Sequence, residues 1–373
     1  MIKYVNLEDV CEILDTQRIP ITASNRTFGV YPYYGANGVQ DYVNDYIFDD
    51  ELVLLAEDGG NFGSANKPIA YRVSGKCWVN NHAHVLKAKE NIDVDYLCYS
   101  LMFYDTTGLV NGATRQKLTQ SAMRKMQIPL IPLTKQKEIV ANLNKVYNVI
   151  NLKQQQLSKL NELVKSRFVE LFGEIGKDTK GWGLKQLGDC CMINPKKGSD
   201  KRLHQDLMVS FVSMPSVSEK GEIDASEIKS YNEVKTGFTY FAEQDVLFAK
   251  ITPCMENGKG AVAKGLRNGI GFGSTEFHVL RPIEDVSNPY WIYFVTAFEQ
   301  FRLDAANNMT GSAGQRRVPA SFLETYKISL PPIELQNQFA TFVEQTDKSK
   351  LAIQKSLEQL ETLKKSLMQQ YFG

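Results

Sequence analysis

The sequence predicts an α+β protein in which two mixed α/β globular units are joined by two long helices that pair as an antiparallel coiled coil. Three observations support this fold class. The chain repeats itself at a spacing of 200 residues, and each repeat ends in a run without glycine or proline, 134–172 and 334–372. Both runs carry apolar residues seven positions apart. The segments ahead of them contain short apolar strands separated by turn residues.

Length and composition are typical of a globular protein with more than one domain. The 373 residues suit two or three domains, and a hydrophobic content of 43% is enough to build their cores. The longest strongly apolar run, 291–298, is far shorter than the roughly 20 residues of a membrane helix. The acidic segment 1–15 does not resemble a secretory signal. The cysteines show no CxxC spacing, so we expect free thiols, no metal site and a cytoplasmic protein.

The internal repeat organises the whole chain. Residues 128–136 (IPLIPLTKQ) match residues 328–336 (ISLPPIELQ), and the same register still aligns Phe172-Gly173 with Phe372-Gly373. Further pairs upstream are His84-Val85-Leu86 with His278-Val279-Leu280, Tyr96-Leu97 and Tyr99 with Tyr290-Trp291 and Tyr293, and Arg115 to Leu118 with Gln315 to Val318. We therefore divide the chain into a first globular unit (1–133), a first helix (134–173), a second globular unit (174–332) and a second helix (333–373).

The two helices, called the arms below, are predicted to pair with each other. Each arm alone has too narrow an apolar face to be stable in water. Because each arm follows its own globular unit, we expect the pairing to be antiparallel. The alternatives are two unrelated surface helices, or a coiled coil that only dimerises the chain. The residues predicted to form the coiled coil and to support docking are Leu143, Ile150, Leu157, Leu160, Val164, Ile353, Leu357, Leu360 and Leu367.

Several segments resemble a known protein family. They are the arm starts (IPLIPLTKQKEI and ISLPPIELQNQF), the arm ends (RFVELFGEI and QQYFG), the start of the second unit (WGLKQLGD), and YPYYGANGV and NNHAHVL in the first unit. In this order, around two long helices, they resemble the DNA-specificity subunit of type I restriction–modification systems. The resemblance covers nearly the whole chain. The first arm departs from the family in having Lys135-Gln136-Lys137 where a Glu-Gln pair is common.

This resemblance implies a protein without catalytic activity of its own. It implies two target recognition domains, each reading one half of a bipartite double-stranded DNA target, and a helical spacer that docks two modification subunits. Those subunits methylate adenine, and two restriction subunits with motor and nuclease activity can join them. No cofactor is then expected in this chain, because S-adenosylmethionine, ATP and Mg belong to the partners. No membrane partner is expected.

Polar loops in each unit are the first candidates for DNA contact. In a Gly-rich loop of the first unit, the aromatic and amide groups of Tyr33, Tyr34 and Asn37 suit base edges. Two further loops, 58–67 and 250–259, follow apolar strands and end in lysine, which suits a phosphate. The alternative for each is an ordinary turn or solvated loop. The candidate residues of these two loops are Asn61, Lys67, Lys250, Thr252 and Lys259.

Two basic triplets occupy equivalent places in the repeat. They are Arg115-Gln116-Lys117 and Gln315-Arg316-Arg317. Arg can bind guanine and Gln can bind adenine through two hydrogen bonds, each worth about 1–3 kcal/mol of discrimination. The alternative is a salt-bridged helix start. His82 and His84 share one face of a predicted strand, and we interpret them as structural or groove-lining, because a metal would need further ligands.

Charge and motifs argue against an enzyme. Residues 1–130 carry 12 basic and 15 acidic side chains, and residues 174–332 carry 19 of each, so neither unit has a basic surplus and we expect this chain alone to bind DNA weakly. An adenine methylase needs an [NDS]-P-P-[YF] loop, and Asn288-Pro289-Tyr290-Trp291 lacks the second proline. No GxxxxGK[ST] phosphate loop occurs. The rival class is a coiled-coil scaffold with two protein-binding heads.

Overall fold

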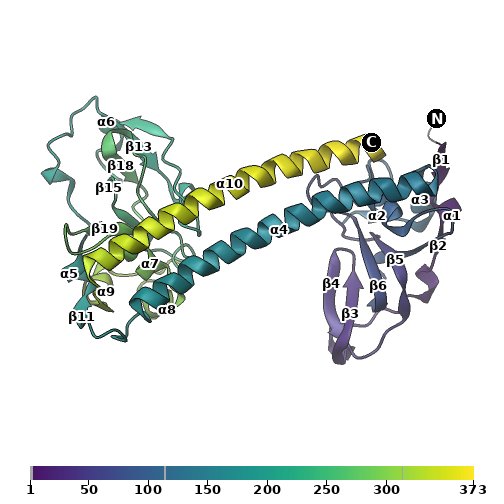
Figure 1. Ribbon diagram of the computed structural model, residues 1–373, viewed down its shortest axis with the longest axis horizontal. Coiled ribbons are helices and arrows are strands. Elements are labelled where there is room, and N and C mark those ends of the chain that lie inside the picture. The colour runs from purple at the N-terminus through teal and green to yellow at the C-terminus, as the bar shows by residue number, and fades with distance from the viewer. Residues whose placement is uncertain (1–2, 113–114, 313) are drawn as a thin grey trace. The chain divides into compact units, whose positions relative to one another are not determined.

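The structure, a computed structural model, describes residues 3–112, 115–312 and 314–373. Contacts divide the chain into two units. Unit 1 consists of Met1–Gln154 and Lys355–Gly373, and unit 2 consists of Gln155–Gln354. Each unit therefore contains one repeated globular part and one half of each arm (Figure 1). Within the described ranges, no helix is both long and apolar enough to cross a membrane.

Unit 1 contains one large sheet. The strands of the whole unit are β1 (Lys3–Asn6), β2 (Cys11–Ile13), β3 (Phe28–Gly35), β4 (Gly38–Val43), β5 (Phe48–Ala56), β6 (Ala70–Val79), β7 (Ala83–Ala88), β8 (Val110–Asn111), β9 (Lys117–Leu118) and β10 (Gln127–Leu130). The short helices of the unit are α1 (Leu7–Val10), α2 (Val94–Met102) and α3 (Gln120–Arg124). The sheet order is β2-β7-β5-β6-β3-β4. Its neighbours are antiparallel except for the parallel pair β3 and β6.

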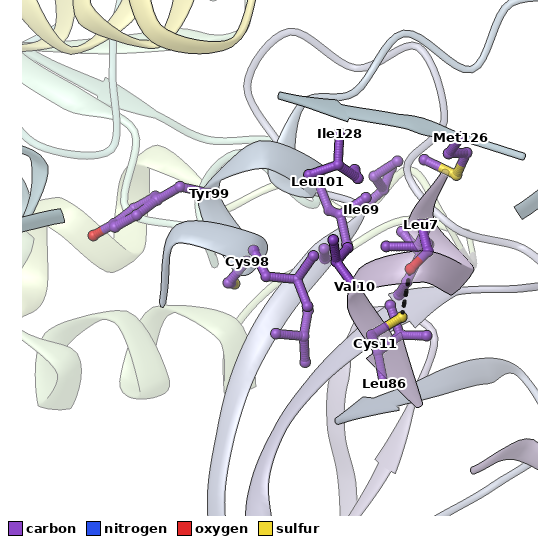
Figure 2. Packing of buried hydrophobic residues seen from close by; sticks show 14 of the residues in the cluster. Leu7, Val10, Cys11, Ile69, Leu86, Cys98, Tyr99, Leu101, Met126 and Ile128 are labelled. Carbon is purple, nitrogen blue, oxygen red and sulfur yellow. Dashed lines mark hydrogen bonds between the residues drawn. The ribbon is translucent and has the colours of Figure 1, made fainter. Parts of the chain in front are cut away.

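Strand β5 shows how the sheet separates two cores. Successive side chains of a strand point to opposite faces. Val53 and Leu55 enter the cluster that includes α2 and both arms, whereas Leu52 and Leu54 enter the cluster on the opposite face. Figure 2 shows side chains from α1, β7, α2 and β10 meeting in the first cluster. Because the second half of β5, Leu52 to Ala56, is buried on both faces, it reads as a continuous apolar run.

Unit 2 repeats this plan and adds a second sheet. Its strands are β11 (Leu184–Gln186), β12 (Cys191–Ile193), β13 (Met208–Val212), β14 (Ile228–Ser230), β15 (Thr239–Ala242), β16 (Val246–Ala249), β17 (Gly260–Val262), β18 (Ile270–Gly273), β19 (Phe277–Pro282) and β20 (Lys327–Ser329), and its helices are α5 (Leu187–Cys190), α6 (Tyr231–Val234), α7 (Pro289–Ala297), α8 (Glu299–Asn307) and α9 (Ala320–Thr325). One sheet has the order β12-β19-β16-β17, and the other has the order β14-β13-β18-β15. In β16, Val246 and Phe248 face α7 and the arms, as their counterparts do in unit 1.

The arms form as predicted, as α4 (Leu133–Phe172) and α10 (Ile333–Phe372). In unit 1, Lys364 of α10 lies over the ring of Tyr147 of α4, 5.4 Å from its centroid. In unit 2, Phe339 of α10 contacts Phe168 and Phe172 of α4, with ring centroids 5.4 Å apart in each case. Early positions of one arm thus meet late positions of the other, so the arms run antiparallel. The predicted seam is inward-facing: Leu143, Ile150 and Val164 are buried, and Leu157, Leu160, Ile353, Leu357, Leu360 and Leu367 are half-buried.

A buried glutamine near the start of each arm ties the arm to its unit. Gln136 accepts a hydrogen bond from the backbone N–H of Asp93, the N-cap of α2, at 2.7 Å and donates to the carbonyls of Asn91 and Ile131. Gln336 repeats the pattern, accepting from Asn288, the N-cap of α7, at 2.8 Å and donating to two carbonyls. The sequence departure at Lys135 therefore leaves this contact intact.

These caps correct the repeat alignment by one residue. Since Asp93 and Asn288 bind equivalent glutamines, Tyr96 corresponds to Trp291, not to Tyr290 as the sequence comparison suggested. Both side chains are fully buried, whereas Tyr290 is half-buried. The loop ahead of α7 is one residue longer than its counterpart, and a pattern match across a loop cannot detect that.

We predict that Gln336→Ala lowers the free energy of unfolding by about 2–4 kcal/mol, because it removes the partner of one buried carbonyl, of one partly buried carbonyl and of one partly buried N–H. Urea unfolding of the whole chain measures this. Gln338→Ala is the matched control, since Gln338 is exposed on the same helix. Equal losses for the two variants would contradict the prediction.

Candidate nucleic-acid interface

Each unit brings two loops side by side. We call the loop after the central strand the strand loop (57–69 after β5, 250–259 after β16) and the loop with the basic triplet the basic loop (112–118 and 311–318). Positions 113, 114 and 313 lie outside the described residues. Each basic loop is closed by antiparallel pairing, of β8 with β9 in unit 1 and of Thr310 with Arg317 in unit 2.

A glycine opens each basic loop. Gly112 and Gly311 have φ values of 102° and 119°, which L side chains rarely adopt. A Cβ at Gly112 would also lie 2.4 Å from the carbonyl oxygen of Arg115, and one at Gly311 would lie 2.9 Å from that of Gln315. The backbone at both positions thus requires glycine.

In unit 1 the predicted residues Asn37, Arg115, Gln116 and Lys117 converge on the strand loop. Asn37, at the tip of the β3–β4 hairpin, donates to the carbonyl of Gly59 at 3.0 Å, and the N–H of Gly59 donates to the carbonyl of Gln116. Arg115 forms an ion pair with Asp58 at 2.6 Å, and Lys117 forms one with Glu57 at 3.1 Å.

In unit 2 the predicted residues Lys250, Thr252, Gln315, Arg316 and Arg317 come together in the same way. The Thr252 hydroxyl accepts from the N–H of Arg316 at 3.1 Å, and the Thr252 N–H donates to the Arg316 carbonyl. The N–H of Val318 donates to the carbonyl of Lys250 at 2.9 Å. The side chain of Gln315 is exposed beside them.

Other predicted residues do not join these groups. Tyr33 is 1% exposed, its hydroxyl exchanges hydrogen bonds with the backbone of Ile21, and Arg26 covers its ring, so the prediction that Tyr33 contacts DNA is wrong. Tyr34 is half-buried and packs on Tyr71, with ring centroids 5.8 Å apart.

Three predicted loop residues have local or isolated positions. Asn61 donates to the carbonyl of Pro68 within its own loop, and Lys259 reaches the carbonyl of Met214 at 3.4 Å, away from the triplet. Lys67 is exposed near the end of the strand loop, where no other described residue pairs with its ammonium group.

Carboxylates that were not predicted from the sequence hold these cations. Arg316 lies 3.4 Å from Glu256, and Arg317 forms a forked pair with Glu276. The hydrogen bonds from Arg317 hold the pKa of the Glu276 carboxyl below its ordinary value. Since each cation of the triplets has an acidic partner, the loops carry ordered donors with little net charge.

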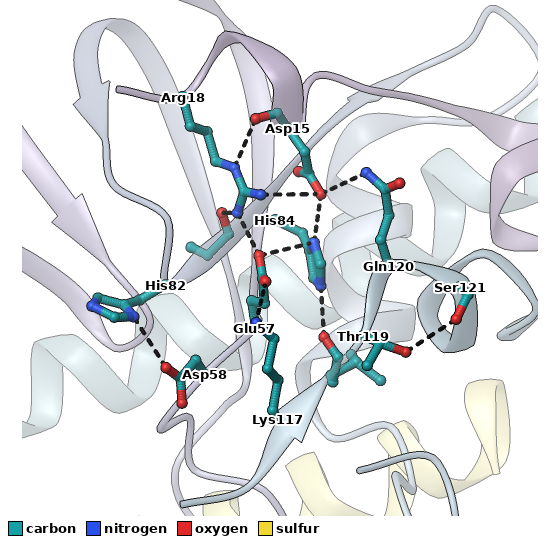
Figure 3. Close-up of polar contacts among 12 residues, drawn as sticks. Asp15, Arg18, Glu57, Asp58, His82, His84, Lys117, Thr119, Gln120 and Ser121 are labelled. Carbon is teal, nitrogen blue, oxygen red and sulfur yellow. Dashed lines mark hydrogen bonds and ion pairs between the residues drawn. The ribbon is translucent and has the colours of Figure 1, made fainter. Parts of the chain in front are cut away.

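A buried histidine contacts the backbone of the basic loop of unit 1 from inside the protein (Figure 3). His84 is 0% exposed, and its Nε2 lies 2.9 Å from the carbonyl oxygen of Leu118, the residue after the triplet. Its Nδ1 lies 2.6 Å from Asp15, whose other oxygen accepts from the N–H of Val85. Both ring nitrogens thus face hydrogen-bonding oxygens, of Leu118 and Asp15. Glu57 extends the cluster by binding Arg18 at 2.6 Å and Lys117.

Unit 2 contains the same tether, with an asparagine in place of the aspartate. Nε2 of His278 donates to the carbonyl of Val318 at 2.8 Å, and Nδ1 accepts from the amide of Asn194 at 3.0 Å. Asn194 also accepts from the N–H of Val279, as Asp15 does from Val85. Burial lowers the pKa of His278, which keeps its ring uncharged.

Asp15, Glu57 and His84 are residue types that can also bind a metal ion, and their potential ligand atoms lie within 4.8 Å of one another. Their oxygens, however, already bind Arg18, Lys117 and the histidine ring. A metal ion would need carboxylate oxygens that are not already paired with cationic side chains. The arrangement therefore fits an ion-pair network better than a metal site.

We predict that the stability contributed by Asp15 depends on pH and that contributed by Asn194 does not. Burial raises the pKa of the Asp15 carboxyl, but the hydrogen bond and charge of His84 and the N–H of Val85 outweigh it, and the net pKa is lowered. A lowered folded-state pKa stabilises the fold above about pH 4, and this contribution is lost as the pH falls further. The difference in unfolding free energy between the wild type and Asp15→Ala should therefore narrow as the pH falls below about 4. The loss in Asn194→Ala should stay constant, and parallel profiles for the two variants would contradict the prediction.

Comparison with known proteins agrees with this geometry. The family model of the type I restriction modification DNA specificity domain matches residues 2–162 and 179–364. The specificity subunits of the type I restriction enzymes EcoAI and EcoEI of Escherichia coli are 42% and 43% identical over 42% and 41% of this chain. These alignments span about a quarter of each relative (26% and 25%). The MjaVIII specificity subunit of Methanocaldococcus jannaschii is 20% identical over 98% of this chain and 91% of its own length.

Two solved structures share the fold. The S subunit of a type I restriction–modification system from M. genitalium has a TM-score of 0.59 at 12% identity, covering 100% of this chain and 96% of that one. A chain from a study of complex assembly and conformational transition of the type I R-M system has a TM-score of 0.54 at 18% identity, covering 99% and 97%. Since the family model spans both repeats and most of each arm, the chain belongs to the family of type I restriction–modification DNA specificity subunits.

Proposed function

We propose that each unit reads one half of a bipartite DNA target through its strand loop and basic loop. One observation carries the proposal: the same loop pair is built twice, on equivalent strands and over equivalent buried histidines. Arg and Gln side chains in such loops suit base edges in the major groove, and Lys suits phosphates. The triplets differ in sequence, so the two half-sites differ.

The arms dock the adenine-methylating subunits and set the gap between half-sites. Leucines that are exposed on both arms are available for this contact. They are Leu152, Leu163, Leu351 and Leu363, which are 46–68% exposed. This chain contributes no catalytic step, and S-adenosylmethionine, ATP and Mg belong to the partner subunits. Restriction subunits join the same assembly.

Binding by the chain alone is weak, because the loop cations already have acidic partners. Each loop cation must give up its carboxylate partner before it can bind a DNA group. These cations are Arg115, Lys117, Arg316 and Arg317. Nonspecific DNA affinity comes from unpaired cationic side chains that displace counterions from the DNA phosphates, and this contribution is reduced here. The partner subunits supply the remaining affinity.

The test is to co-express the chain with its modification subunit and map methylated adenines across a plasmid library. We expect a single two-part motif with a fixed gap, because each unit reads its own half-site. The same cells without this chain are the control. A library without methylated adenine, together with failure to select any DNA sequence, would favour a scaffold with protein-binding heads.

We predict that Arg316→Ala relaxes one half-site and leaves the other unchanged. A lost two-bond contact from Arg to a guanine corresponds to about a 10- to 100-fold loss of discrimination at that base. Arg316 is the better candidate in unit 2, because it is held by one long ion pair whereas Arg317 is forked onto Glu276.

Methylation mapping of Arg316→Ala measures the relaxation. Arg267→Ala is the matched control, since Arg267 is exposed in the 3-10 helix before β18. An equal loss of methylation at all sites, with both half-sites still fully discriminated, would mark Arg316 as a phosphate contact and contradict the prediction.

A further inference from the structure

We infer that His84 and His278 are positioning residues that determine how sharply each unit reads its half-site. They act from inside the protein, through the backbone of the basic loop. The inference rests on the proposed function and deepens it, because it assigns a role in DNA reading to residues that cannot touch DNA.

The residue that follows each triplet is fixed through its backbone. Leu118 is held at both backbone groups: its N–H donates to the carbonyl of Glu57 at 2.8 Å, and its carbonyl accepts from His84. Val318 is held in the same way by the carbonyl of Lys250 and by His278. The preceding base-contact candidates are therefore attached to a residue with both hydrogen-bonding groups fixed.

Both histidines are buried and are fixed by neighbouring side chains. Each lies on the strand next to the central strand, β7 or β19, and each is almost fully buried, at 0% and 5% exposure. Each ring is oriented by one further side chain, Asp15 or Asn194, that is also bonded to the same strand. A ring fixed at both nitrogens places the loop carbonyl with little freedom, as a supporting shell does for a binding site.

The bond from the histidine to the loop carbonyl occurs in both units, although its surroundings differ. The partner of the histidine differs in charge between the units, ionic in unit 1 and neutral in unit 2, and the carboxylate near the last triplet residue also differs in position. Glu57 follows the central strand of unit 1, whereas Glu276 precedes His278 in unit 2. The bond from the histidine to the loop carbonyl is nevertheless the same, at 2.9 and 2.8 Å. Packing alone does not require this one bond in both surroundings.

The experiment uses the full chain in complex with its modification subunit and compares His278→Ala with His278→Gln. We expect His278→Ala to raise methylation at sites with a wrong base in the second half-site about 10-fold, while the first half-site and the gap stay unchanged. His278→Gln should restore part of the discrimination, because an amide N–H can replace Nε2–H as the donor to Val318. His84→Ala should relax only the first half-site.

A core variant separates positioning from stability. Phe272→Leu lies in β18 of the other sheet of unit 2 and is compared with His278→Ala at temperatures where both variants are equally folded. If Phe272→Leu relaxes the second half-site as much as His278→Ala, or if His278→Ala leaves both half-sites sharp, the inference is overturned.

A second measurement does not depend on DNA. Amide hydrogen exchange of the purified chain should speed up at 314–318 in His278→Ala and not in Phe272→Leu. If the wild type yields no two-part motif but the exchange difference is present, the proposed function fails while the tether stands. A two-part motif in the wild type with unchanged exchange in His278→Ala overturns the tether alone.

Discussion

Each arm depends on burial of a narrow apolar seam, because a helix of this length with one apolar stripe is unstable in water by itself. Residues such as Leu143 and Val164 are almost fully buried, and each contributes about 1.5–3 kcal/mol through burial. In each unit this seam is covered by the other arm and by helix α2 or α7. The buried Gln136 and Gln336 then fix the register between arm and helix with directional hydrogen bonds. The position of α2 or α7 fixes the sheet, and the sheet fixes the loops.

The two units hold their basic loops with chemically different clusters at the same place. In unit 1 the carboxylates of Asp15 and Glu57 share a buried site with Arg18 and His84. Burying charges costs several kcal/mol per ion unless pairing is complete, and here each oxygen has a partner. In unit 2, Asn194 achieves the same orientation of His278 without charge. The hydrogen bond to the loop carbonyl is therefore the same in both units, although a charged cluster supports it in unit 1 and a neutral amide supports it in unit 2.

The arms and the strand–loop plan were predictable because their signals are local. Heptad spacing gave α4 and α10 within a residue of their observed bounds, and the repeat indicated both basic loops. The role of Tyr33 was misjudged because a Gly-rich, aromatic segment can be a mobile loop or, as here, a strand whose alternate side chains point inward. The carboxylate partners could not be predicted, since Asp58 and Arg115 lie 57 positions apart and meet only through the fold. The one-residue shift at α7 was likewise invisible without its cap.

Pairing of the loop cations with carboxylates has a consequence for specificity. In the proposed binding mode, an Arg316 that left Glu256 for a phosphate would exchange one anion for another, and the freed carboxylate would repel the DNA backbone. A guanine edge repels it less, because O6 and N7 are neutral acceptors and a carboxylate can accept from the N4 amino group of a paired cytosine. Acidic partners thus penalise phosphate contacts more than base contacts. Such penalties against the wrong partner are a general source of discrimination, and they suit a protein whose net charge of +1 gives it little attraction for DNA at large.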